Sequence, residues 1–307
     1  MYNMIELSKY TNCILCPRHC KVDRSKEMGV CHSSDRCSIV RAALHYWEEP
    51  CISGDEGSGT IFFSGCSLGC VYCQNYAISD GKSKYGVDVT VDRLVEIFFE
   101  LKDKGANNIN FVTPTHYMPH IKQAIVQAEK QGFTLPFVYN TSGYENVSSL
   151  RELDGLIDVY LPDFKYYDDM LASRYSKAPD YVCRAKEAIE EMVRQVGKPQ
   201  FDENGIIRKG VIVRHMILPG HTKDSMRVIE YLHHTYGESI YISIMNQYTP
   251  VKTTRMEKYT ELGRSITARE YDKVIDYAIS IGVENAYIQE GETNKESFIP
   301  AFDGEGC

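Results

Sequence analysis

Residues 60–73 read Thr60-Ile61-Phe62-Phe63-Ser64-Gly65-Cys66-Ser67-Leu68-Gly69-Cys70-Val71-Tyr72-Cys73. The apolar run 61–63 predicts a buried strand, and three cysteines follow it directly with the spacing C-x3-C-x2-C. Three thiolates on one short loop suit three corners of a cubane cluster, whereas structural zinc requires four ligands. A [4Fe–4S] cluster normally takes four thiolates, so three leave one iron open to a small-molecule ligand. Gly65 and Gly69 provide the backbone freedom that wrapping a cluster demands.

Downstream of this loop, short apolar runs alternate with amphipathic stretches. Strands are expected over residues 61–63, 108–112, 137–139, 156–161, 210–218 and 239–245, with a final strand over 286–289. Helices are expected over residues 90–104, 119–131, 181–196, 224–234 and from Thr267, which forms a Thr-x-x-Glu capping box with Glu270. Because strands that alternate with helices form parallel sheets, we predict an α/β fold, a partial (β/α)6 TIM-like barrel with a small Cys-rich N-terminal extension. Residues just after each strand of such a barrel gather at one mouth and form the active site.

The domain organisation follows from a shift in composition. Residues 53–59 are rich in Gly, Ser and Asp, which indicates a boundary. We therefore predict a Cys-rich metal- or cluster-binding segment over residues 1–59, a core barrel over 60–250, and a helical extension over 251–307.

Composition and charge exclude several classes of protein. Lys and Arg number 34 against 42 for Asp and Glu, a net charge of −8, and no basic run stands out, which argues against a nucleic-acid binder. No apolar stretch approaches the roughly 20 residues that span a bilayer. The first ten residues lack the apolar region of a secretory signal, so a cytoplasmic protein is expected. The 11 cysteines crowd toward the N-terminus, and in a reducing compartment such clusters bind metal more often than they form disulfides.

Four N-terminal cysteines form a separate ligand set, Cys13-x2-Cys16-x3-Cys20-x10-Cys31. Four thiolates saturate either a zinc ion or a [4Fe–4S] cluster. The spacing alone leaves both alternatives open.

The loop Cys66-x3-Cys70-x-Tyr72-Cys73 resembles that of the radical S-adenosylmethionine (SAM) superfamily, in which it ends the first barrel strand. The resemblance implies that the amino and carboxylate groups of SAM chelate the open iron. It also implies reductive cleavage of SAM to methionine and a 5′-deoxyadenosyl radical, which abstracts hydrogen from a substrate. Tyr72 then lies beside the adenine, and an electron donor such as flavodoxin or ferredoxin is the expected partner.

Within that superfamily the chain resembles the pyruvate formate-lyase activating enzymes and activase-like proteins of unproven substrate. The likeness is carried by residues 60–66 and 73–79 and by the ends of later strands. It implies SAM contacts at Thr113, Thr115, Asn140, Thr141, Asp163, Lys165, Arg214 and Asn246. Asp163 is expected to accept from the ribose hydroxyls, Lys165 to pair with the SAM carboxylate, and Arg214 to find a carboxylate such as that of SAM. The Gly-Gly-Glu of the activases is replaced here by Thr113-Pro114-Thr115.

Three functions are compatible with these patterns. The first is a radical SAM oxidoreductase, resembling formate-lyase activating enzyme, that takes hydrogen from a protein or peptide. The second is a radical SAM enzyme acting on a small molecule. The third is a non-catalytic iron–sulfur electron carrier, which would not need charged residues such as Asp163, Lys165 and Arg214 at successive strand ends.

Overall fold

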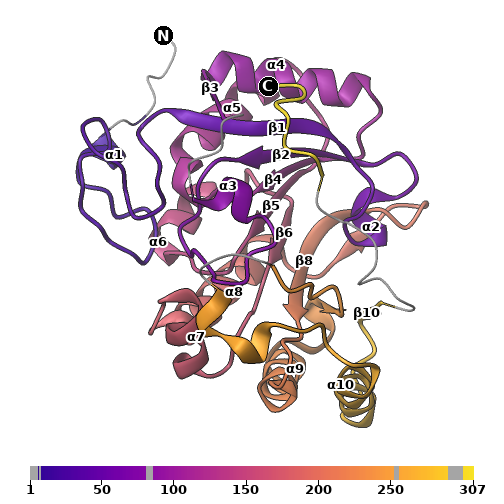
Figure 1. Cartoon of the computed structure of the whole chain (residues 1–307). Helices are drawn as coiled ribbons and strands as arrows, with labels where there is room; N and C mark the ends of the chain where they lie inside the picture. Colours follow the sequence, from indigo (N-terminus) through magenta and orange to yellow (C-terminus); the bar gives the residue numbers. More distant parts are fainter. Residues whose placement is uncertain (1–5, 7, 81–85, 252–255, 290–299) are drawn as a thin grey trace.

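Ten strands form one sheet in the computed structural model, which describes residues 6, 8–80, 86–251, 256–289 and 300–307. Seven neighbouring strands run parallel: β2 (Ser58–Phe63), β4 (Ile109–Val112), β5 (Phe137–Thr141), β6 (Val159–Pro162), β8 (Ile207–Met216), β9 (Tyr241–Met245) and β10 (Ala286–Ile288). The sheet curls without closing, from β10 at one edge to β3 (Val87–Val89) at the other (Figure 1). This arrangement confirms the α/β fold and the partial TIM-like barrel, including the final strand.

Helices cover the outside of the curved sheet (Figure 1): α4 (Val91–Asp103), α5 (Met118–Lys130), α8 (Tyr181–Val196), α9 (Thr222–Tyr236) and α10 (Ala268–Ser280). Each lies within a few residues of its predicted range because its apolar positions recur at helical spacing. The predicted capping box is present, with Thr267 and Glu270 bonded reciprocally. Among the helices that the structure describes, none is long and apolar enough to cross a bilayer.

Short elements connect these layers and were not predicted. They are α1 (Ser8–Thr11), α2 (Pro50–Ser53), α3 (Tyr76–Ser79), α6 (Val147–Leu150), α7 (Asp169–Ser176), β7 (Gln200–Phe201) and the 3₁₀ turns Thr115–Tyr117, Arg151–Leu153, Gly237–Ser239, Met256–Lys258 and Thr260–Leu262. Most are too short to show a periodic sequence signal.

The N-terminal segment contributes a strand that the sequence did not reveal. β1 (Cys37–His45) pairs antiparallel with β2 and β3, so the sheet crosses the boundary predicted after residue 59. The C-terminal residues lie beside β1, where Ala42 N–H donates to the Glu305 carbonyl at 2.8 Å. Residues 252–255 and 290–299 of the predicted extension lie outside the described residues.

Aromatic packing fixes the sheet against its helical cover. Phe98 of α4 contacts Phe111 of β4 with ring centroids 5.6 Å apart, and Phe111 stacks on Phe137 of β5 at 5.8 Å. Burying each such ring contributes about 1.5–3 kcal/mol relative to leaving it exposed. The strand ends that follow are therefore held on a rigid scaffold.

Candidate active site

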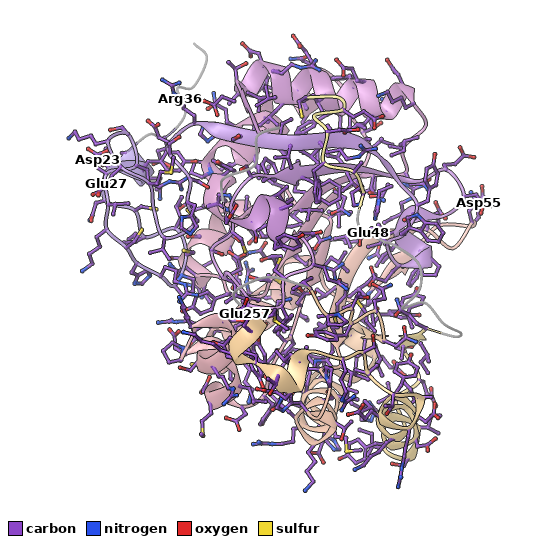
Figure 2. The ribbon with its side chains drawn as sticks, in the orientation of Figure 1. Asp23, Glu27, Arg36, Glu48, Asp55 and Glu257 are labelled. Carbon is purple, nitrogen blue, oxygen red and sulfur yellow. The ribbon has the colours of Figure 1, made fainter. Side chains whose placement is uncertain are left out.

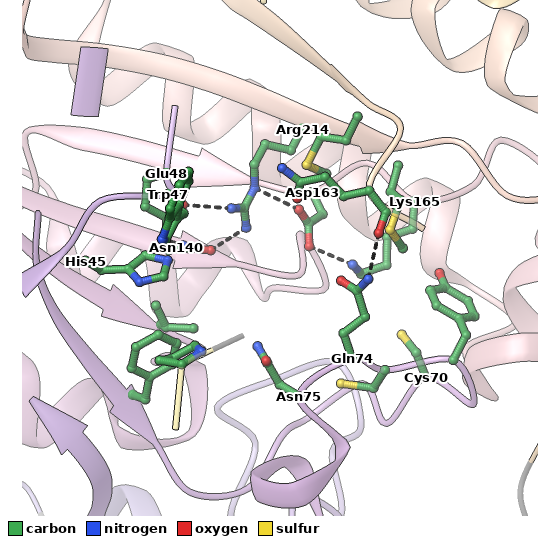
Figure 3. Close-up of a pocket in the computed structure, with 18 residues that line it drawn as sticks. His45, Trp47, Glu48, Cys70, Gln74, Asn75, Asn140, Asp163, Lys165 and Arg214 are labelled. Carbon is green, nitrogen blue, oxygen red and sulfur yellow. Dashed lines mark hydrogen bonds and ion pairs between the residues drawn. The ribbon is translucent and has the colours of Figure 1, made fainter. Parts of the chain in front are cut away.

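A cavity of about 220 Å³ lies inside the barrel, where the ends of the parallel strands meet the cysteine loop (Figure 3). Its polar and sulfur-bearing lining includes Glu48, Cys70, Tyr72, Cys73, Gln74, Asn140, Asp163, Lys165 and Arg214. The parallel topology accounts for this meeting, because consecutive strands deliver their carboxyl ends to one edge.

Arg214 is the centre of a largely buried charge network in this cavity (Figure 3). Its guanidinium donates to Asp163 at 3.1 Å, to Glu48 at 3.1 Å and to the amide oxygen of Asn140 at 2.6 Å. Lys165 Nζ donates to the second carboxylate oxygen of Asp163 at 2.6 Å. Within the protein, Arg214 thus has two carboxylate partners, Asp163 and Glu48.

Burial and charge together set the pKa values in the network. Burial lowers the pKa of Arg214, but Asp163, Glu49 and Glu48 outweigh it and raise that pKa above its usual range. Burial opposes ionisation of Asp163, yet Lys165 and Arg214 hold the pKa of its carboxyl below the usual value. Burial raises the pKa of Glu48 despite the opposing Arg214. The cavity therefore presents an ionised Asp163 beside two cations.

The three loop thiols lie close to one another and to this network. Burial raises the pKa of Cys66, and burial together with the Cys66 and Cys70 thiols raises that of Cys73 to about 12. Cys70 Sγ accepts from Ser176 Oγ at 3.0 Å, and Cys66 Sγ accepts from the Leu68 N–H at 3.4 Å. Metal ligation removes thiol protons, and hydrogen bonds to sulfur tune cluster potential, so the donor set fits an iron–sulfur cluster.

Two glycines of the loop give a matched test of its packing. At Gly65 (φ +88°) a Cβ would lie 2.4 Å from Ser33 Oγ and 2.5 Å from the Cys31 carbonyl oxygen. At Gly69 (φ +68°) a Cβ meets no atom within 4 Å. We expect Gly69→Ala to lower the free energy of unfolding by about 1–2 kcal/mol through backbone strain alone. Gly65→Ala should cost about 2 kcal/mol more because it also overpacks.

Urea unfolding of the two glycine variants beside the unsubstituted protein measures this difference. Equal losses of stability in both variants would contradict the close contact between the loop and the N-terminal segment.

Comparison with known proteins decides the family. The sequence profile of the Radical SAM superfamily matches residues 60–232, which is more than half of the chain and runs from within β2 to within α9. The chain belongs to the radical SAM superfamily. The resemblance noted from the cysteine loop is thereby confirmed at the level of the superfamily.

Individual relatives of this radical SAM protein are distant. The uncharacterized protein MJ0674 of Methanocaldococcus jannaschii is 26% identical over 293 residues, covering 92% of this chain and 79% of the relative. SuiB of Streptococcus suis, solved with SAM and with its precursor peptide SuiA, gives TM-scores of 0.51 and 0.50 at 15% and 14% identity. These matches cover 74% of this chain and 49% and 47% of SuiB, so the chain spans about half the length of SuiB.

A domain of pyruvate-formate lyase-activating enzyme from Bacteroides vulgatus is also similar, with a TM-score of 0.44 at 12% identity. The match covers 60% of this chain and all of that domain.

The structure separates the expected SAM-contact residues into two groups. Tyr72, Asn140, Asp163, Lys165 and Arg214 line the cavity. The other four are not among the described residues that line the cavity: Thr113, Thr115, Thr141 and Asn246. The hydroxyls of Thr115 and Thr141 both donate to one oxygen of the buried Glu145.

Thr113 and Asn246 lie at strand ends, where their backbone N–H groups donate hydrogen bonds. Thr113 has φ +60°, a conformation that favours glycine, and its N–H donates to the Asn140 carbonyl at 2.9 Å. The Asn246 N–H donates to Gln289 Oε1 at 3.0 Å. Tyr72 is buried, and its hydroxyl lies 2.7 Å from that of Tyr166.

Glu145 predicts a pH dependence of stability. Burial outweighs the two threonine hydroxyls and raises the pKa of Glu145 from 4.5 to about 7. The pKa of Glu145 is higher in the folded protein than in the unfolded chain. Protonation of Glu145 therefore stabilises the fold fully below about pH 4.5, and this stabilisation is lost as pH rises through about 7. The free energy of unfolding should therefore fall, relative to Glu145→Gln, by about 2.5 kcal/mol between about pH 5 and pH 8.

Urea unfolding of both proteins across this range measures the difference, with Glu203→Gln on an exposed turn as control. A gap between Glu145→Gln and the unsubstituted protein that stays constant with pH would refute the assignment.

Sequence reasoning missed Glu48 and Gln74 as site residues. Glu48 follows β1, reaches Arg214 from the N-terminal segment, and also accepts from Asn110 at 3.2 Å. Gln74 directly follows Cys73, and its side chain donates to the Gln247 carbonyl at 2.7 Å. In the sequence, the position of Gln74 next to Cys73 indicated a role at the site. No sequence pattern marked Glu48 in this way.

Proposed function

We propose that this chain is a SAM-cleaving enzyme in which Cys66, Cys70 and Cys73 hold a [4Fe–4S] cluster. One observation carries the proposal: Cys70 and Cys73 of the three-thiol loop line the same cavity as Asp163, Lys165 and Arg214. When bound, the cluster supplies the electron that cleaves SAM to methionine and a 5′-deoxyadenosyl radical, which takes hydrogen from the substrate. A flavodoxin or ferredoxin is the electron donor that we propose.

The cavity residues have distinct tasks in this proposal. The Lys165 ammonium pairs with the SAM carboxylate through a charge-assisted hydrogen bond. The ionised Asp163 accepts from the ribose hydroxyls, and Tyr72 lies against the adenine. Arg214 is a positioning residue, because its guanidinium holds both Asp163 and Asn140. Such pre-set geometry lowers the cost of orienting the cosubstrate.

We further propose that the substrate is a protein or peptide segment. A second cavity of about 510 Å³ shares Glu48, Arg214 and Gln247 with the first, so a substrate group there adjoins the cosubstrate. Tyr46 and Trp47 line it and are about half exposed, and such aromatic side chains are enriched where polypeptides dock. The peptide-bound structure of the related SuiB supports the same choice.

Anaerobic reconstitution with iron and sulfide, followed by dithionite and SAM, tests the proposed reaction. We expect 5′-deoxyadenosine in amounts that scale with protein. Its absence from a protein that carries the loop cluster would leave the electron-carrier alternative.

Stimulation by cell extract tests the substrate class. A protein or peptide substrate should raise 5′-deoxyadenosine formation in a fraction that is retained by a size filter and destroyed by protease. A stimulating fraction that passes the filter and survives protease would favour a small molecule.

A further inference from the structure

The N-terminal segment turns sharply around its cysteines. His19, Lys21 and His32 have φ of 41°, 57° and 60°, and they flank Cys20 and Cys31 directly. Left-handed backbone at non-glycine residues costs about 1–2 kcal/mol each, so it persists where the surroundings require it. These turns direct the cysteines of the segment toward a common interior.

The four cysteines Cys13, Cys16, Cys20 and Cys31 lie in one compact loop region. A Cβ added at Gly29 would lie 3.2 Å from Cys31 Sγ and 3.6 Å from Cys20 Sγ, so these two sulfurs flank one point. Backbone bonds between Cys13 and residues 21–22 bring Cys13 beside Cys20. The His19 N–H donates to the Cys16 carbonyl at 3.1 Å, so a tight turn joins Cys16 to Cys20. Cys13, Cys16 and Cys31 are buried.

Arg24 supplies a buried positive charge at this site. Its side chain is 1% exposed and donates to the backbone carbonyls of Ser33, Ser34 and His116. Among the described residues no carboxylate forms an ion pair with it. The adjacent Asp23 lies at the edge of the molecule (Figure 2), and its carboxylate pairs with Lys26 at 2.8 Å.

The Cβ added at Gly29 would also lie 3.7 Å from Arg24 Cδ, so the Arg24 side chain adjoins the thiols of Cys20 and Cys31. A buried charge without a counter-charge is costly, so a negative centre beside Arg24 would stabilise the fold. Four thiolates around a metal centre provide that charge, whereas four protonated thiols do not.

Four thiolates complete the ligand shell of a zinc ion or of a [4Fe–4S] cluster, and metal analysis separates the two.

We propose that Cys13, Cys16, Cys20 and Cys31 bind a second [4Fe–4S] cluster, saturated by four thiolates and neutralised in part by Arg24. Assembly releases the four thiol protons. Because every iron carries a cysteine, this cluster has no open position for SAM. The site adjoins the radical SAM loop, since Cys66 N–H donates to the Cys31 carbonyl at 3.1 Å.

Iron, sulfide and zinc analysis of the anaerobically reconstituted full chain tests the proposal. We expect about eight iron and eight sulfide per chain. The triple variant Cys66→Ala, Cys70→Ala, Cys73→Ala should keep about four of each, with a reduced spectrum that SAM does not change. About four iron and one zinc per chain, or about four iron and no zinc, would overturn the proposal.

Single substitutions assign the ligands. Cys20→Ala removes the most exposed of the four thiols and should leave about four iron, with a loop-cluster spectrum that still responds to SAM. Cys37→Ala, at a buried position six residues beyond Cys31, should keep about eight iron. Unchanged iron content in a Cys20→Ala protein with wild-type circular dichroism would refute the assignment. Failure of SAM cleavage alone would leave these metal counts intact, so the two proposals fail separately.

Discussion

Alanine in place of Cys66, Cys70 or Cys73 is expected to lower the rate of 5′-deoxyadenosine formation by more than about 100-fold. Loss of an outer partner of a metal ligand typically costs 10- to 100-fold, so loss of a ligand should cost more. The three thiols lie on a single loop, and in the described structure Cys66 and Cys73 are already close enough for their charges to interact. Each is therefore needed, and none is positioned to replace another.

The measurement is 5′-deoxyadenosine released per chain under dithionite, with the iron content of each variant determined in parallel. Cys51→Ala and Cys183→Ala are matched controls, one buried beside the sheet and one exposed on α8. Both should retain the activity of the unsubstituted protein. A Cys66→Ala, Cys70→Ala or Cys73→Ala variant with more than a tenth of that activity would contradict the ligand assignment.

The barrel could be predicted because its signals are local. Residues 181–196 show apolar positions at helical spacing, and the structure places α8 over the same range. The capping box at Thr267 likewise depends on four consecutive residues. Parallel topology brings the ends of neighbouring strands together, so site residues can be predicted once the strands are located. This is how the sequence identified Asp163, Lys165 and Arg214 as candidate site residues.

The missed residues acquire their roles only through tertiary structure. Glu48 is one of several acids in a loop with no motif, and its contact with Arg214 joins positions 166 residues apart. Glu145 is buried by the folded barrel, where it accepts hydrogen bonds from the hydroxyls of Thr115 and Thr141. β1 lies in a segment dominated by cysteine and charge, so its apolar residues gave no clear strand pattern.

Replacing Arg214 by methionine is expected to lower the free energy of unfolding by about 3–5 kcal/mol. The change keeps much of the side-chain volume but leaves Glu48 and Asp163 without their shared cation, and breaking a buried ion pair from one side costs this much. Both carboxylates are at most 16% exposed, so water compensates little.

Arg208→Met is the control for the Arg214 substitution, because Arg208 lies on the same strand and pairs with Asp202 at 2.6 Å but is 42% exposed. A surface pair of this kind contributes about 0–1 kcal/mol, so urea unfolding should separate the two variants clearly. The double variant Arg214→Met, Glu48→Gln should recover part of the lost free energy of unfolding, because the second change removes one uncompensated charge. If Arg214→Met costs no more than Arg208→Met, the carboxylates are hydrated rather than held by the guanidinium. Arg214 would then not position Asp163 and Asn140 for the cosubstrate.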